Sequence, residues 1–140
     1  MSVQLNPYLN FRDRAREALE FYHSVFGGDL QMSTFKEFQA SQDPAEDDLI
    51  MHGQLQGDHG VALMASDLPS SMEYQEPGSF SVSLSGDDEA VLRGWWDKLG
   101  EGGTVSMPLN KAPWGDWFGM VVDRFGISWL VNISGQPQQG

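Results

Sequence analysis

The sequence contains no cysteine, and this absence removes several chemistries at once. Disulfide bonds, thiolate nucleophiles and thiolate metal sites all need that side chain. Basic residues are also few, 8 against 20 acidic ones, which gives a formal net charge of −12. A chain with this charge repels phosphate backbones and anionic lipid surfaces. We therefore expect no nucleic acid and no membrane among its partners.

Long apolar runs are missing as well. No stretch approaches the roughly 18 apolar residues of a membrane-spanning helix. The first residues, MSVQLNPYLNF, lack a basic segment followed by an apolar one, so the expected location is the cytoplasm. The chain does have a globular composition, with 40% hydrophobic residues over 140 positions. That length fits a single domain with a buried core.

The first half of the chain predicts a strand, a helix and three further strands. Residues 3–11 alternate between apolar and polar side chains as a strand does, and Pro7 places that strand at a sheet edge or bulge. Residues 13–26 change to a helical period and stop at two glycines. Three more strands are expected, at 29–38, 50–56 and 61–66.

The second half repeats this order. Strands are expected at 79–85, 104–107, 117–122 and 127–133, with a helix between the first two. On that helix, Trp95 and Trp96 share an apolar stripe with Leu92 and Leu99 and are predicted to be core residues. The alternative is that one of the two rings reaches a subunit interface. The two hairpins align at an offset of 66 residues, which places Gly53 on Gly119. Such internal repetition indicates a duplicated unit.

These patterns predict one domain over residues 1–134, made of two β-α-β-β-β repeats at 3–67 and 79–134. The proline- and serine-bearing stretch from 68 to 78 is expected to connect the repeats. The last residues, 135–140, read GQPQQG and have nothing to bury. We expect them to form a disordered tail.

Four motifs in this order resemble one known family. They are NPYLNF, EALEFYHSVFGG, PAEDDLIMHGQL with LMASD, and WGDWFGMVVDRFGISWLVN, and together they span most of residues 3–134. The chain is similar to the PhnB-like branch of the vicinal oxygen chelate superfamily, which includes glyoxalase I, extradiol dioxygenases and bleomycin resistance proteins. The resemblance implies an α+β fold whose tandem units form a curved mixed sheet with a cleft. It also implies a homodimer, because two chains commonly complete the paired clefts in this superfamily.

The resemblance further implies four places for metal ligands, on the first and last strands of each unit. Met64 and Leu130 stand where metal-dependent relatives carry a carboxylate. The first strands offer Asn6 and Tyr8 in one unit and only serines in the other. Thioether, amide and hydroxyl groups replace carboxylate and imidazole poorly as ligands. We therefore expect no tightly bound metal and no cofactor.

Strand alternation then assigns side chains to the predicted cleft. Ile50, His52 and Gln54 are expected to share its face with Met64, and Phe118 and Met120 with Leu130. Trp114 and Trp117, in a glycine-bearing loop, either close over a ligand or anchor the loop. The predicted ligand-binding residues are Asn6, Tyr8, His52, Gln54, Met64, Trp114, Trp117, Phe118, Met120 and Leu130.

Catalytic residues are not identified by the sequence, although His52 is a candidate. An imidazole facing a pocket can act as a base near neutral pH. It can equally be a packing residue bonded to a neighbour, since no Asp or Glu on the same strand orients it. Asp116 is an acidic candidate near the cleft mouth or, alternatively, a turn-forming residue.

The prediction for function is a small organic ligand bound in the cleft without the superfamily's metal ligands. One alternative is a metal-dependent lyase or dioxygenase of the glyoxalase type. The other is a resistance protein that sequesters a drug.

Overall fold

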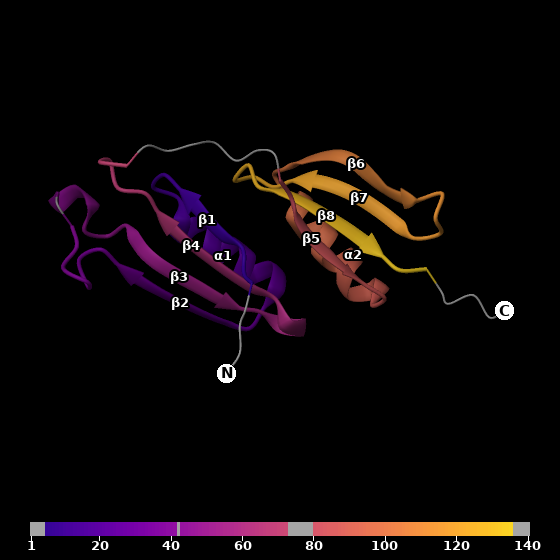
Figure 1. Ribbon diagram of the computed structural model, residues 1–140, viewed down its shortest axis with the longest axis horizontal. Coiled ribbons are helices and arrows are strands. Elements are labelled where there is room, and N and C mark those ends of the chain that lie inside the picture. The colour runs from indigo at the N-terminus through magenta and orange to yellow at the C-terminus, as the bar shows by residue number, and fades with distance from the viewer. Residues whose placement is uncertain (1–4, 42, 73–79, 136–140) are drawn as a thin grey trace. The chain divides into compact units, whose positions relative to one another are not determined.

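The computed structural model describes residues 5–41, 43–72 and 80–135. Contacts divide the chain into two compact units, residues 1–75 and 76–140. Each contains one helix and one mixed four-stranded sheet, as Figure 1 shows. The predicted α+β fold with a duplicated β-α-β-β-β order is therefore confirmed. The predicted tail falls mostly, and the connection between repeats partly, outside the described residues.

The first unit has the sheet order β1-β4-β3-β2. Its elements are β1 (Tyr8–Phe11), α1 (Ala15–Phe26), β2 (Asp29–Thr34), β3 (Ile50–Gln56) and β4 (Ala62–Asp67), with short 3₁₀ turns at Pro44–Glu46 and Asp58–Gly60. β1 runs parallel to β4, and the other pairs are antiparallel. β1 lies at the sheet edge, in agreement with the expectation from Pro7.

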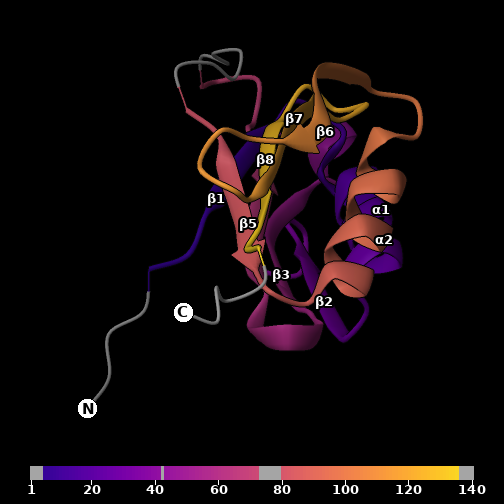
Figure 2. The ribbon, with the colours of Figure 1, turned by 90° about the vertical axis from the view of Figure 1, so that its right-hand side faces the viewer.

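The second unit has the equivalent order β5-β8-β7-β6. Its elements are β5 (Val82–Gly86), α2 (Glu89–Gly100), β6 (Thr104–Lys111), β7 (Trp117–Val122) and β8 (Ser128–Ile133). Figure 2 shows α2 lying along one face of this sheet. None of the helices among the described residues is long and apolar enough to cross a lipid bilayer.

Several element ends differ from the sequence prediction, and four of these differences have a clear local reason. The first helix begins at Ala15 because Asp13 has a φ of 66°, outside the right-handed helical region. β2 ends at Thr34, whose N–H and hydroxyl both donate to the Glu37 carboxylate in a turn. β1 begins only where its pairing with β4 begins, at Tyr8 opposite Met64. β6 continues to Lys111 with two register shifts in its pairing with β7. Pro108 fits there because an irregular edge strand does not need every backbone N–H for pairing.

A glycine at the same place in each repeat brings the helix close to its sheet. A Cβ on Gly53 would collide with the Leu19 side chain of α1. A Cβ on Gly119 would lie 2.7 Å from the Trp96 ring of α2 and 2.9 Å from the Leu109 Cα. Gly53 and Gly119, which align in the sequence repeat, therefore mark a point of close helix-to-sheet packing in each unit.

The two helices cover their sheets to different extents. α1 packs on β2, β3 and β4, and its buried residues are Ala15, Ala18, Leu19, Tyr22, Val25 and Phe26. α2 packs mainly on β5, β7 and β8 and buries only Leu92 and Leu99. The prediction that Trp95 and Trp96 are core residues is wrong, since both side chains are only partly buried. The bulged edge strand β6 does not close over them as β2 closes over α1.

Candidate functional site

Each sheet has a face that its helix does not cover. In β4, Leu63 and Ala65 are buried on the helix side, so Met64 points to the opposite face. In β8, Trp129 and Val131 are buried on the helix side, and Leu130 points away. We call these surfaces, turned away from α1 and α2, the open faces of the two sheets.

Cross-strand pairing aligns the open-face side chains into matching rows. In the first unit, Tyr8 pairs with Met64, Met64 with Gln54, and Gln54 with Gln31. In the second unit the row is Ser83, Leu130, Met120 and Met107. Directly opposed residues in a sheet have Cβ atoms about 4.5–5.5 Å apart, so neighbours in each row are within contact distance. Of the predicted site residues, Tyr8, Gln54 and Met64 share one row, and Met120 and Leu130 share the other.

His52 lies beside the first row. It pairs with Ser33 across β2, and its ring centroid is 6.3 Å from that of Tyr8 with the planes tilted by 37°. The imidazole is half-buried, at an aromatic corner of the open face. Its nearest ring neighbour is thus a phenol, a hydrogen-bonding group without charge at neutral pH.

Ile50 was expected beside His52 but lies in the core, with no exposed surface. The ladder between β2 and β3 shifts register between Ser33 and Thr34, which breaks the alternation at this end of β3. The Ile50 N–H donates to a carboxylate oxygen of Asp67, at 3.0 Å, and the Ala15 N–H donates to the other, at 2.8 Å. Asp67 thereby joins the start of α1 to two strands.

Trp114 and Trp117 have different surroundings, and Trp117 is the first residue of β7 and not part of the loop. Trp114 is 62% exposed and meets Phe118 edge to face, with ring centroids 5.7 Å apart. Trp117 lies beneath the Arg93 guanidinium of α2, whose Cζ is 4.9 Å from the ring centroid. Trp114 therefore extends the open face next to Phe118, whereas Trp117 packs against the helix side.

Asp116, between these tryptophans, is held by the end of β8. Its carboxylate accepts hydrogen bonds from Asn132 Nδ2, at 3.0 Å, and from the Gly135 N–H, at 2.9 Å. The Asn132 bond above all, and then the Gly135 bond, lower the pKa of this carboxyl group. Of the two roles considered for Asp116, this geometry favours the turn-forming one.

Asn6 is the predicted residue least connected with the others. It is half-buried, two positions before the start of β1, and it has no cross-strand partner in the pairing of β1 with β4. Sequence reasoning also missed open-face residues, namely Gln31, Ser83 and Met107. Their alternation is visible in the sequence, but the register that places them in these rows is set only by strand pairing.

The chain can now be compared with known proteins. A profile of the Glyoxalase/Bleomycin resistance protein/Dioxygenase superfamily matches residues 4–131. The chain belongs to this superfamily. Protein YjdN of Escherichia coli is 27% identical over 149 residues, covering 98% of this chain and all of that protein.

Solved structures of other proteins have the same fold as this chain. The crystal structure of protein PA1353 from Pseudomonas aeruginosa has 40% sequence identity and a TM-score of 0.81, covering 96% of this chain and all of that one. A Bacillus cereus PhnB protein, described as a putative 3-demethylubiquinone-9 3-methyltransferase, has 21% identity and a TM-score of 0.73 over 94% of this chain. A PhnB protein is thus among the structural neighbours, as the sequence motifs predicted.

The superfamily's divalent metal does not fit the residues at the four equivalent places. Tyr8 and Met64 are direct neighbours in the first unit, and Ser83 and Leu130 in the second. A phenol, a thioether, a hydroxyl group and an aliphatic side chain do not supply the anionic oxygens and imidazole nitrogens that such ions prefer. Within the described ranges, no group of three or more His, Asp and Glu side chains could hold a metal ion.

Proposed function

We propose that the protein binds a small, uncharged organic ligand on the open faces of its sheets and that this binding needs no metal ion. The observation that carries the proposal is the pair of matched rows, Tyr8–Met64–Gln54 and Ser83–Leu130–Met120. All six side chains are uncharged, and all are at least partly exposed. A concentration of aromatic, thioether and amide groups of this kind is typical of small-molecule sites.

The two rows offer different chemistry. The first presents the Tyr8 phenol and the Gln54 amide on either side of Met64. The second is dominated by Leu130 and Met120, with Phe118 and Trp114 close by. The first surface therefore suits hydrogen-bonding groups, and the second suits an aromatic or aliphatic body. Phenols and aromatic amides are the simplest molecules of this class.

Charge favours the same class. With a net charge of −12 the whole chain repels anionic ligands. Neither row supplies a cation to offset that repulsion, because both consist of uncharged residues. An uncharged ligand avoids this electrostatic penalty as well as the cost of removing a charge from water.

We extend the proposal to a homodimer that works in the cytoplasm, with small molecules as its other partners. Both points rest on the likeness to the superfamily and on the acidic, cysteine-free composition of the chain. The metal-dependent lyase or dioxygenase and the drug-sequestering protein remain the alternatives that the experiments must separate.

A thermal-shift screen tests the proposal directly. Tag-free protein is mixed with a panel of uncharged phenols and aromatic amides. Bleomycin is added to the panel because resistance proteins of the superfamily are named after this drug. A ligand that binds only the folded protein raises its Tm. We expect a rise with members of the panel that persists in EDTA. A rise only after metal is added, with stoichiometric metal in the purified protein, would instead support the enzyme alternative, and a response to bleomycin alone would support the resistance alternative.

A pair of methionine variants locates the bound ligand. Met64→Glu places a carboxylate in the first row, whereas Met51→Glu makes the same change on β3 at a position that is 37% exposed and outside the row. We expect the first variant to weaken binding at least about tenfold, since it puts a charge where an uncharged ligand packs. The second should bind as the wild type does. Equal binding by both variants would contradict the proposed site.

A further inference from the structure

A small pocket lies between α2 and β6 in the second unit. Its volume is about 290 Å³, at the lower end of the range of about 300–1,000 Å³ typical of ligand sites. The residues that line it are Arg93, Trp96, Asp97, Val105, Pro108 and Leu109. Because α2 forms one wall, the pocket is on the helix side of the sheet and is separate from the open face.

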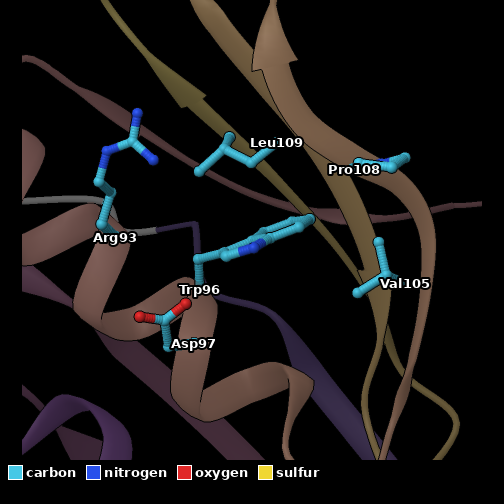
Figure 3. A pocket seen from close by; sticks show the side chains of 6 residues that line it. All are labelled: Arg93, Trp96, Asp97, Val105, Pro108 and Leu109. Atoms are coloured by element: carbon cyan, nitrogen blue, oxygen red, sulfur yellow. The ribbon is translucent and has the colours of Figure 1, made fainter.

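One part of the pocket is apolar. The Trp96 ring packs on Gly119, where a Cβ would lie 2.7 Å from it, and the ring is only partly buried. Figure 3 shows the side chains of Val105 and Pro108, from β6, on the opposite side of the indole from the two charged residues. This part of the pocket therefore suits an aliphatic or thioether group.

The other part carries two opposite charges that do not pair with each other. Arg93 and Asp97 are four residues apart on α2, so they share one face of the helix. The Arg93 Nε instead donates to the Glu89 carboxylate at 2.9 Å, and among the described residues Asp97 forms no ion pair. A carboxylate four residues before a cation on a helix is better placed than one four residues after it. Asp97 is thus an anion without a counter-charge from the helix.

The Arg93 side chain is held in place by two contacts. Besides the bond to Glu89, its Cζ lies 4.9 Å from the centroid of the Trp117 ring. The terminal nitrogens of a guanidinium can bind a second carboxylate while Nε keeps the first. The pocket therefore presents a positioned cation and an anion next to an apolar wall.

This combination selects a class of ligand by its charge. A simple anion is disfavoured by the net charge of −12 and by the neighbouring Glu89 and Asp97 carboxylates. A simple cation is disfavoured by Arg93. A zwitterion offers a carboxylate to Arg93 and an ammonium group to Asp97, and it has no net charge for the chain to repel.

We propose that this pocket binds an α-amino acid with an apolar side chain of about the size of leucine or methionine. The carboxylate binds Arg93, the ammonium group binds Asp97, and the side chain packs between Trp96 and β6. Both charged partners contact water, so we expect a modest Kd of about 0.1–1 mM. The site goes beyond the proposed function and does not depend on the ligand of the open faces.

A titration with L-leucine, followed by the indole N–H signals in ¹H–¹⁵N NMR spectra, tests the site. The spectrum of Trp96→Phe identifies the Trp96 signal, and Trp129, which is fully buried, is the internal reference. We expect a saturable shift of the Trp96 signal with Trp129 unchanged. Leucinamide and N-acetyl-leucine each lack one of the two charges, and glycine lacks the apolar side chain. All three should bind at least about tenfold more weakly.

Two isosteric variants test the charged partners. Arg93→Gln and Asp97→Asn each remove one charge, and we expect each to weaken leucine binding about tenfold. Matched controls on the other helix are Arg16→Gln and Glu20→Gln, which make the same charge changes at exposed positions of α1. These should bind leucine as the wild type does. The dispersion of the amide signals shows that each variant is folded.

Each contrary result overturns a distinct part of the proposal. No saturable shift of the Trp96 signal up to about 10 mM leucine would contradict the site, since the expected Kd is at least tenfold lower. Equal binding of leucine, leucinamide and N-acetyl-leucine would contradict recognition of a zwitterion. Wild-type affinity in folded Arg93→Gln and Asp97→Asn would contradict the roles of these residues. None of these results bears on the screen with phenols and aromatic amides, because those ligands are uncharged and are assigned to the open faces.

Discussion

The two units share one repeat but differ in how completely the helix covers the sheet. α1 buries six residues and packs on the edge strand β2, whereas α2 buries two and leaves Trp96 only partly buried. Gly53 and Gly119 set the same close approach in both units. The difference teaches that two copies of a duplicated unit can keep the same helix-to-sheet approach while one copy buries less of its helix.

The open faces differ in a second way. The first presents a phenol, an amide and an imidazole, and the second presents mainly aliphatic, thioether and aromatic groups. The two rows occupy equivalent places in the repeat but carry side chains of different chemistry. This division underlies the proposal of a ligand with both hydrogen-bonding and apolar parts.

The largest expected effect on stability comes from removing the aromatic ring at the equivalent position of each helix, Tyr22 in α1 and Trp96 in α2. Tyr22→Ala should cost about 3–5 kcal/mol of unfolding free energy, since the ring is fully buried. Trp96→Ala should cost no more than about 2 kcal/mol in the monomer, because part of its ring already contacts water. Urea unfolding at low protein concentration measures both. Equal costs would show that the two helices are covered alike.

A smaller loss is expected from the buried carboxylate of the second hairpin. Asp123 is 3% exposed and accepts hydrogen bonds from the Phe125 and Ile127 N–H groups and from Trp129 Nε1. Asp123→Ala leaves these donors without that acceptor and should destabilise the protein by about 3 kcal/mol.

The control for this change lies in the other hairpin, where Gly57 occupies the place of Asp123 in the repeat. Asp58 next to it is exposed, so Asp58→Ala should change stability by less than about 0.5 kcal/mol. Thermal unfolding of both variants provides the measurement. A similar loss in the two hairpins would contradict the structural role given to Asp123.

The smallest expected effect is the loss of the Asp116 hydrogen bonds at low pH. The folded-state pKa of Asp116 lies below its ordinary value of 3.8, chiefly because Asn132 donates to the carboxylate. The contribution of this contact is therefore fully present above that ordinary pKa and is lost as pH falls through the lower folded-state value. NMR titration of the Asn132 side-chain amide should show a transition below pH 3.8 that Asp116→Asn removes. A transition at or above that pH would contradict the assigned hydrogen bonds.

Much of the fold followed from local signals in the sequence. The predicted limits of β3 and β7 agree with the structure, because alternation and neighbouring glycines define central hairpin strands. The edge strands β1 and β6 were misjudged, since their ends depend on where a partner strand begins or bulges. The predicted full burial of Trp96 was wrong for a similar reason. The helical period of α2 does not indicate how far the neighbouring strand β6 covers the helix.

The candidate site was predictable only in part. Alternation placed Met64 and Gln54 on one face, and pairing of β3 with β4 makes them neighbours. It failed at Ile50, where a register shift interrupts the period. The separation of Trp114 from Trp117 depends on contacts with Phe118 and Arg93, which are distant in sequence or on another element.

Methionine methyl groups provide the most direct test of ligand binding on the open faces. Met64 and Met120 lie in the two rows, whereas Met32 pairs with Gly53 on the helix side and serves as an internal control. Methyl-labelled protein is titrated with the panel compound that raises Tm most, and single Met→Leu variants assign the signals. We predict shifts of the Met64 and Met120 signals with Met32 unchanged. Shifts confined to Met32, with both row signals unchanged at saturation, would contradict the proposed site.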